Sequence, residues 1–142
     1  MSDSALTDDG FLGGRLRILQ PRVGYRAATD PVLLAAATPA KPGEAVLELG
    51  CGVGVASLCL LSRVPNLSVS GVERQEDYAG LAVRNAERNG LPFTVTHADL
   101  ARLPPQLRAL SFDHVIANPP YFRAGDGTLA QDPSREAAFR EE

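Results

Sequence analysis

The fold of this chain is decided by the stretch AVLELGCGVG, residues 45–54. An apolar run typical of a buried strand leads directly into a turn with a glycine at every second position. An apolar helical pattern follows over residues 55–63. Glycines leave such a turn without Cβ atoms, so a ligand can approach the backbone where the helix begins. The stretch therefore predicts a strand, a ligand-binding turn and a helix in immediate succession.

The same alternation continues on the C-terminal side of this stretch. A helix is expected over 75–89, because apolar residues lie near its middle and Asn89-Gly90 is a typical stop. Further strands are expected over 67–72, 93–96 and 112–117. Alternating strands and helices predict an α/β fold, a parallel sheet with helices on both faces.

On the N-terminal side the signals are shorter. Residues 16–19 alternate apolar and charged side chains, which predicts a small, half-exposed β segment before the sheet. Asp30-Pro31 predicts a helix N-cap followed by a proline in the first turn. Residues 1–10 are polar and acidic, and we expect a disordered tail there, with one domain over residues 11–142.

Composition excludes several classes of protein. The 142 residues carry a net charge of −3, which argues against a generally basic nucleic-acid coat. The two cysteines, Cys51 and Cys59, form no metal-binding pattern, so we expect reduced thiols, no metal and a cytoplasmic protein. No apolar run reaches the roughly 18 residues that a membrane span needs, and no signal peptide is evident.

Glu48 distinguishes between possible ligands of the glycine turn. The GxGxG spacing differs from the GxGxxG pattern of dinucleotide-binding proteins. A carboxylate just before the turn would repel a phosphate and attract a cationic group. Both observations argue against a nicotinamide dehydrogenase.

Acidic residues follow the next two strands, at the edge of the sheet where ligands bind. Glu73 can accept hydrogen bonds from both hydroxyls of a ribose; the alternative is a solvated acid at a strand end. Asp99 can accept a hydrogen bond from the exocyclic amine of adenine, with Ala98 and Leu100 beside the ring. The alternative for Asp99 is a helix cap or a turn residue.

Asn118-Pro119-Pro120-Tyr121, at the end of the fourth strand, is the most specific motif. Two prolines end the strand and stiffen its exit. The Asn118 oxygen and a backbone carbonyl can hold the two hydrogens of a planar NH2 group, and Tyr121 can stack on the group that carries it. The alternative is an ordinary proline turn.

Together these motifs resemble the Rossmann-type methyltransferases that use S-adenosylmethionine. The resemblance implies catalytic residues at Asn118, Pro119, Pro120 and Tyr121. It implies cofactor contacts at Glu48, Gly50, Cys51, Gly52, Gly54, Glu73, Arg74, Ala98, Asp99, Leu100 and Asn118. Such enzymes have seven strands, of which this chain supplies four, so the resemblance implies the N-terminal, truncated portion of a class I methyltransferase domain.

A narrower resemblance lies upstream. Residues 11–16, 24–26 and 29–36 are similar to the bacterial tRNA adenine-N6 methyltransferases that act on position 37 of a valine tRNA. This implies tRNA as the substrate and cofactor contacts at Thr29 and Asp30; a plain N-cap is the alternative for Asp30. The arginines nearby either touch phosphates or form a solvated face. They are Arg15, Arg17, Arg22 and Arg26.

The implied reaction is in-line transfer of a methyl group from a sulfonium to nitrogen, and it needs no general base. The motif at Asn118 serves a glutamine side-chain amide as well as an adenine, so a protein glutamine methyltransferase remains an alternative. A non-catalytic cofactor-binding fragment is another. The expected strand 112–117 has no fifth strand beside it, and self-association through that edge is expected.

Overall fold

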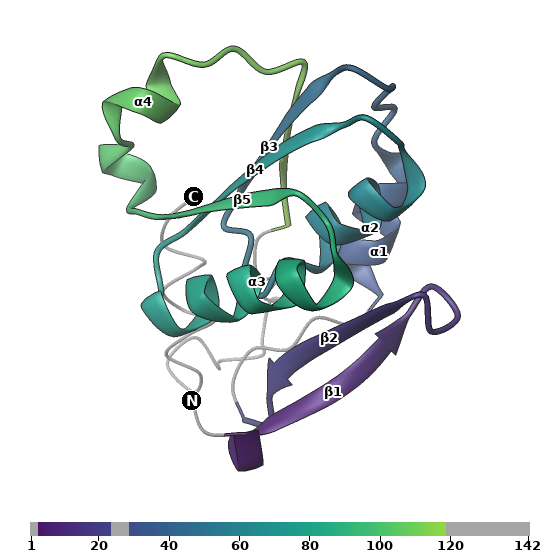
Figure 1. Ribbon diagram of the computed structural model, residues 1–142. Helices are drawn as coiled ribbons and strands as arrows, with labels where there is room; N and C mark the ends of the chain where they lie inside the picture. Colours follow the sequence, from purple (N-terminus) through teal and green to yellow (C-terminus); the bar gives the residue numbers. More distant parts are fainter. Residues whose placement is uncertain (1–2, 24–28, 119–142) are drawn as a thin grey trace, which may run out of the picture.

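The sheet at the centre of the molecule is parallel and has four strands, in the order β5-β4-β3-β6. The computed structural model describes residues 3–23 and 29–118 (Figure 1). The sheet strands are β3 (Ala45–Leu49), β4 (Ser68–Glu73), β5 (Phe93–His97) and β6 (His114–Ala117). All four predicted strands are present, and the last begins two residues later than expected.

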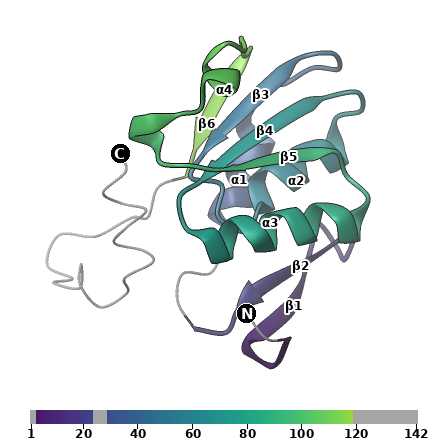
Figure 2. The same cartoon turned by 60° about the vertical axis from the view of Figure 1, so that its left-hand side comes forward.

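Helices cover both faces of the sheet, as predicted. On one face lie α2 (Val55–Arg63) and α3 (Glu76–Asn89), with α1 (Asp30–Ala37) packed on α2. On the other face lie the short helices η2 (Leu100–Arg102) and α4 (Pro105–Arg108), which the sequence did not predict (Figure 2).

The alternating direction of side chains along each strand explains why the sheet has an apolar layer on both of its faces. Val46 belongs to the large apolar cluster beneath α2 and α3, whereas its neighbour Leu47 packs with Val72 and Leu107 on the opposite face. Successive side chains of a strand point to opposite faces, so one strand contributes to both layers. The carboxyl ends of the strands meet at an edge between these layers, which is where parallel α/β sheets generally bind ligands.

Residues 3–10 do not form the disordered tail expected from the sequence. Asp3–Ala5 form the short helix η1, and β1 (Leu6–Phe11) pairs antiparallel with β2 (Leu16–Pro21). Backbone pairing along the whole of β2 stabilises this polar stretch, and Leu6 adds a buried side chain. The Asp9 carboxylate accepts hydrogen bonds from Thr7 and Gln20, which satisfies a charge that had suggested disorder.

A second correction concerns the start of α1. Thr29, not Asp30, is the N-cap residue, and its backbone carbonyl accepts the first helical hydrogen bond, from Leu33 at 3.0 Å. Asp30 is the first residue of the helix, where a negative charge is favoured by the helix dipole. The predicted proline in the first turn is present.

Candidate active site

The glycine turn between β3 and α2 has three residues with positive φ. Gly50, Gly52 and Gly54 have φ of 68°, 56° and 98°, a region that side chains with a Cβ rarely adopt. A Cβ placed on Gly50 or Gly52 would meet no atom within 4 Å, so the backbone there faces open space. Gly54 is different, because a Cβ there would lie 3.1 Å from the ring of Phe93. The turn therefore offers bare backbone to a ligand on one side and packs tightly on the other.

Neighbouring strand ends hold the turn in place. The Cys51 N–H donates to the Val72 carbonyl at 3.0 Å, and the Gly52 N–H donates to Glu73 Oε1 at 2.9 Å. Glu73 Oε2 accepts a second backbone hydrogen bond, from Gln75 at 2.8 Å. Glu73 is only 4% exposed, which excludes the solvated-acid interpretation. Each carboxylate oxygen has a further lone pair with which to accept a ligand hydroxyl.

Glu48 is buried beside the turn, and its surroundings affect its protonation. The Ser57 hydroxyl donates to its Oε1 at 2.6 Å, and burial raises the pKa of Glu48 to about 8. Burial therefore favours the neutral form of Glu48, whereas the sequence suggested a negative charge at this position. A cation bound nearby would favour the ionised form and lower this pKa again.

The end of β5 lies beside the end of β4. The Ala98 N–H donates to the Glu73 carbonyl at 3.0 Å. Asp99 Oδ1 accepts a hydrogen bond from the Ala101 N–H at 2.9 Å and so caps η2, the role that the sequence analysis gave as its alternative. Leu100, like Ala98, is partly buried and packs on the cluster around Leu107. Arg74 is exposed, and its carbonyl accepts a hydrogen bond from His97 Nε2, a partner that the sequence did not reveal.

A pocket joins several of these groups. It brings Asn118, which is half-buried at the end of β6, to the same cavity as the glycine turn and Glu48. Its lining residues are Pro31, Glu48, Gly50, Cys51, Gly52, Val53, Val55, Ala56, Tyr78 and Asn118. Five lining residues were not among the site residues predicted from the sequence, because apolar residues and a helical tyrosine look like ordinary core residues. They are Pro31, Val53, Val55, Ala56 and Tyr78.

Other predicted site residues lie at the border of this pocket or beyond it. Thr29 and Asp30 are exposed and directly precede Pro31, which lines the pocket. Glu73 and Asp99 are not among the lining residues. The catalytic candidates Pro119, Pro120 and Tyr121 lie outside the described residues.

Three of the four arginines proposed for phosphate contacts bond within the chain. Arg15 donates to the Ser62 carbonyl, Arg17 to the Asp8 carbonyl and Arg22 to the Ser4 carbonyl. All three side chains remain exposed, so these bonds stabilise the hairpin formed by β1 and β2 while the charges stay in contact with solvent. Arg26 lies outside the described residues.

Residues 3–23 and 29–118 hold neither a candidate membrane span nor a candidate metal site. No helix in these ranges is long and apolar enough to cross a bilayer. Nor do three His, Cys, Asp or Glu side chains come together there in a way that could hold a metal ion. Both cysteines are buried free thiols, and burial raises the pKa of Cys59 to about 11.

Comparison with known sequences gives consistent results. The family model described as "Methyltransferase small domain" matches residues 28–137. A tRNA1(Val) (adenine(37)-N6)-methyltransferase of Salmonella paratyphi B is 31% identical over 140 residues. The match covers 96% of this chain and 56% of that protein, so the chain spans about half the length of this relative.

Two of the solved structures with a similar fold align with this chain as follows. TrmN from Thermus thermophilus aligns with a TM-score of 0.55 and 30% identity, covering 65% of this chain and 28% of that one. The Pyrococcus abyssi tRNA (uracil-54, C5)-methyltransferase, solved in complex with S-adenosyl-L-homocysteine, aligns with a TM-score of 0.63 and 22% identity. That alignment covers 82% of this chain and 28% of the other.

Proposed function

Because the chain belongs to the methyltransferase small domain family, we propose that it is the cofactor-binding part of an S-adenosylmethionine-dependent enzyme that methylates the N6 amine of an adenine in tRNA. The observation that carries the proposal is the pocket shared by the glycine turn, Glu48 and Asn118. It lies at the carboxyl ends of parallel strands, where α/β proteins bind their ligands.

The residues present fit S-adenosylmethionine. The turn at Gly50 and Gly52 leaves open space above its backbone, and the buried Glu48 offers a carboxyl group to the cationic methionine end. Glu73 has lone pairs left for the ribose hydroxyls, and Asp99 lies at the next strand end for the adenine amine. When bound, the cofactor supplies a methyl group that the neighbouring sulfonium makes electrophilic.

Asn118 is the residue we assign to the substrate nitrogen. The lone pair of an amine conjugated to a ring is delocalised, which makes it a poor nucleophile. An oxygen acceptor on each N–H would favour a more tetrahedral nitrogen, and the Asn118 side chain with the Pro119 carbonyl would provide the two acceptors. Orientation of the two reactants supplies much of the remaining rate. An adenine reaches such a pocket only after leaving its stack.

The choice of tRNA rests on the relatives. The Salmonella protein named as a tRNA adenine-N6 methyltransferase matches almost the whole of this chain. The cytoplasmic location expected from the sequence agrees with a tRNA substrate. A glutamine amide in a protein would use the same acceptors, and a methylation assay with both substrates distinguishes the two.

Calorimetry tests the cofactor assignment. We expect the chain to bind S-adenosylmethionine or S-adenosylhomocysteine, and NAD weakly or not at all. Glu73→Ala should weaken binding by roughly 1–3 kcal/mol, because it leaves buried hydrogen-bonding groups unpaired. Glu87→Ala, which changes an exposed acid on α3, is the control and should bind normally. Equal affinity for NAD would contradict the proposal.

A second experiment tests Asn118 in the full-length protein. Asn118→Ala should abolish methylation of unmodified tRNA while cofactor affinity stays nearly unchanged, because Asn118 is assigned to the target nitrogen. Radiolabelled methyl transfer measures the first quantity and calorimetry the second. Near-normal turnover of the variant would show that Asn118 does not have this role.

A further inference from the structure

Asn85, in the middle of α3, is completely buried and uses every hydrogen-bonding group of its side chain. Its Oδ1 accepts from the Leu19 N–H at 2.8 Å, and its Nδ2 donates to the Leu19 carbonyl at 3.1 Å. The second Nδ2 hydrogen goes to the Val53 carbonyl at 3.0 Å. One side chain thus joins α3, the hairpin and the glycine turn.

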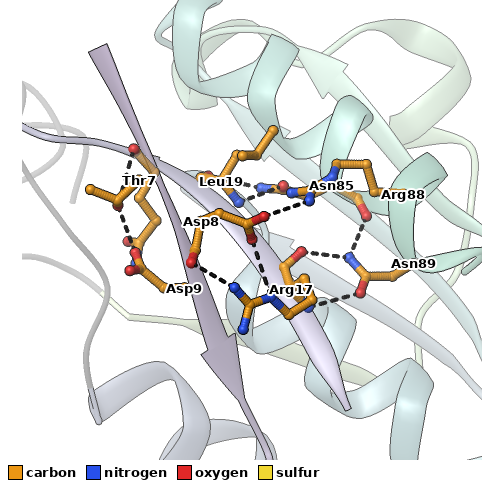
Figure 3. A network of polar contacts seen from close by, with 9 residues as sticks. Thr7, Asp8, Asp9, Arg17, Leu19, Asn85, Arg88 and Asn89 are labelled. Carbon is orange, nitrogen blue, oxygen red and sulfur yellow. Dashed lines mark hydrogen bonds and ion pairs between the residues drawn. The ribbon is translucent and has the colours of Figure 1, made fainter. Parts of the chain in front are cut away.

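Asn89, one helical turn later, repeats the first part of this arrangement. Its Oδ1 accepts from the Arg17 N–H and its Nδ2 donates to the Arg17 carbonyl, both at 3.0 Å (Figure 3). Residues four apart on a helix rise about 6 Å, and residues two apart on a strand about 6.7 Å, so the spacings match. The side-chain amides of Asn85 and Asn89 therefore pair with the edge of β2 that does not pair with β1, much as the backbone of a neighbouring strand would.

The two asparagines differ in their third hydrogen bond. The remaining Nδ2 hydrogen of Asn89 bonds within α3, to the Asn85 carbonyl at 2.7 Å. That of Asn85 leaves the helix and reaches Val53, the residue between Gly52 and Gly54. Of these two asparagines, Asn85 is the one that connects the β1-β2 hairpin to the pocket.

The Val53 carbonyl needs such a partner. Val53 is 6% exposed, and a buried carbonyl without a hydrogen bond is costly. The preceding peptides of the turn are fixed through the N–H groups of Cys51 and Gly52, which bond to β4. The bond from Asn85 holds the carbonyl of the Val53–Gly54 peptide, directly before the left-handed Gly54. The Gly54 N–H of the same peptide donates to the Cys51 carbonyl at 3.0 Å.

We propose that Asn85 is a positioning residue for the cofactor: it holds the Val53 peptide in its binding orientation and makes that orientation depend on the docked β1-β2 hairpin. The proposal rests on the proposed function, because it takes the glycine turn as the cofactor-binding turn. Asn85 touches neither the cofactor nor the substrate in this role. It acts through the shape of the turn.

The test compares Asn85→Ala with Asn89→Ala, which removes a matched pair of bonds to β2. Both variants should lose stability, measured by urea unfolding. Hydrogen exchange of the Val53 and Gly54 amides, without ligand, should become roughly tenfold faster in Asn85→Ala only. Affinity for S-adenosylhomocysteine, measured by calorimetry, should fall by a similar factor in that variant and stay nearly unchanged in Asn89→Ala.

Equal effects of the two variants on the turn would overturn the proposal, because they would show a general loss of stability. If the protein bound no S-adenosylhomocysteine at all, the proposed function would fail while the exchange data still tested the coupling. If Asn85→Ala does not fold, NMR of the unaltered protein replaces it. Adding S-adenosylhomocysteine should then slow exchange of the Asn85 Nδ2 hydrogens and leave those of Asn89 unchanged; an unchanged Asn85 would refute the coupling.

Discussion

Glu48 and Glu73 show how differently two buried carboxyl groups can be used at one site. Glu73 accepts two backbone hydrogen bonds and so shapes the turn. Glu48 accepts hydrogen bonds from the hydroxyl and the backbone N–H of Ser57, but burial dominates its protonation. The sequence placed both acids correctly at strand ends, but their different surroundings depend on which N–H groups the fold brings near.

Glu48 should make the stability of the protein depend on pH. Its pKa is about 8 in the folded chain against an ordinary value of 4.5, so its favourable contribution is complete below pH 4.5 and is lost as the pH rises to 8. The slope can approach about 1.4 kcal/mol per pH unit. In Glu48→Gln, which keeps an acceptor for Ser57, the free energy of unfolding should change less between pH 5 and pH 8. Urea unfolding at several pH values measures both proteins.

Other shifted groups titrate outside this window. The hydrogen bond from Arg88 lowers the pKa of Asp8, and that from His114 lowers the pKa of Glu44. Burial raises the pKa values of both cysteines above their usual range. If the free energies of unfolding of the wild type and of Glu48→Gln changed equally with pH, the pKa of Glu48 would not be raised in the folded chain.

At the scale of elements, two glycines in neighbouring elements predict opposite effects. A Cβ on Gly71, in β4, would lie 2.5 Å from the Phe93 ring and 2.9 Å from the Cys51 sulfur. Gly71→Ala should therefore destabilise the protein by about 1–3 kcal/mol through overpacking. Gly80, in α3, has no atom within 4 Å of such a Cβ, and Gly80→Ala should stabilise by about 0.5–1 kcal/mol. Urea unfolding gives both values, and the same sign for both would contradict this packing.

The sequence predicted the elements that have a clear pattern. The alternation of strands and helices around residues 45–54 was sufficient for the sheet, and the stop at Gly90 is a left-handed C-cap with φ of 63°. Strand β1 was not predicted from the sequence, because Asp8 and Asp9 interrupt any alternation of apolar and polar residues. Its stability comes from pairing with β2. The role of Asn85 was also invisible, since its partners lie 66 and 32 residues away in the chain.

At the scale of the whole molecule, the two faces of the sheet are covered unequally. The face with α2 and α3 is also screened by the hairpin, which packs on α3. The opposite face has only η2 and α4 among the described elements, and Val115 on β6 is 59% exposed there. Within residues 3–23 and 29–118, β6 pairs with β3 alone, so its other edge is unpaired.

This edge leads to a prediction about assembly. An unpaired, apolar edge strand is a template for pairing with another chain, and a lysine on such a strand opposes it. We expect the 142-residue chain to self-associate as its concentration rises and to be a poor catalyst, because no strand within residues 3–23 and 29–118 pairs with that edge to hold Asn118 in place. Val115→Lys should lower the average mass measured by light scattering, with little change in stability, because the side chain is exposed.

The control is Val83→Lys, on an exposed position of α3, which should leave association unchanged. A monodisperse monomer with full activity, or an equal effect of the two lysines, would show that the β6 edge is not the surface through which chains associate.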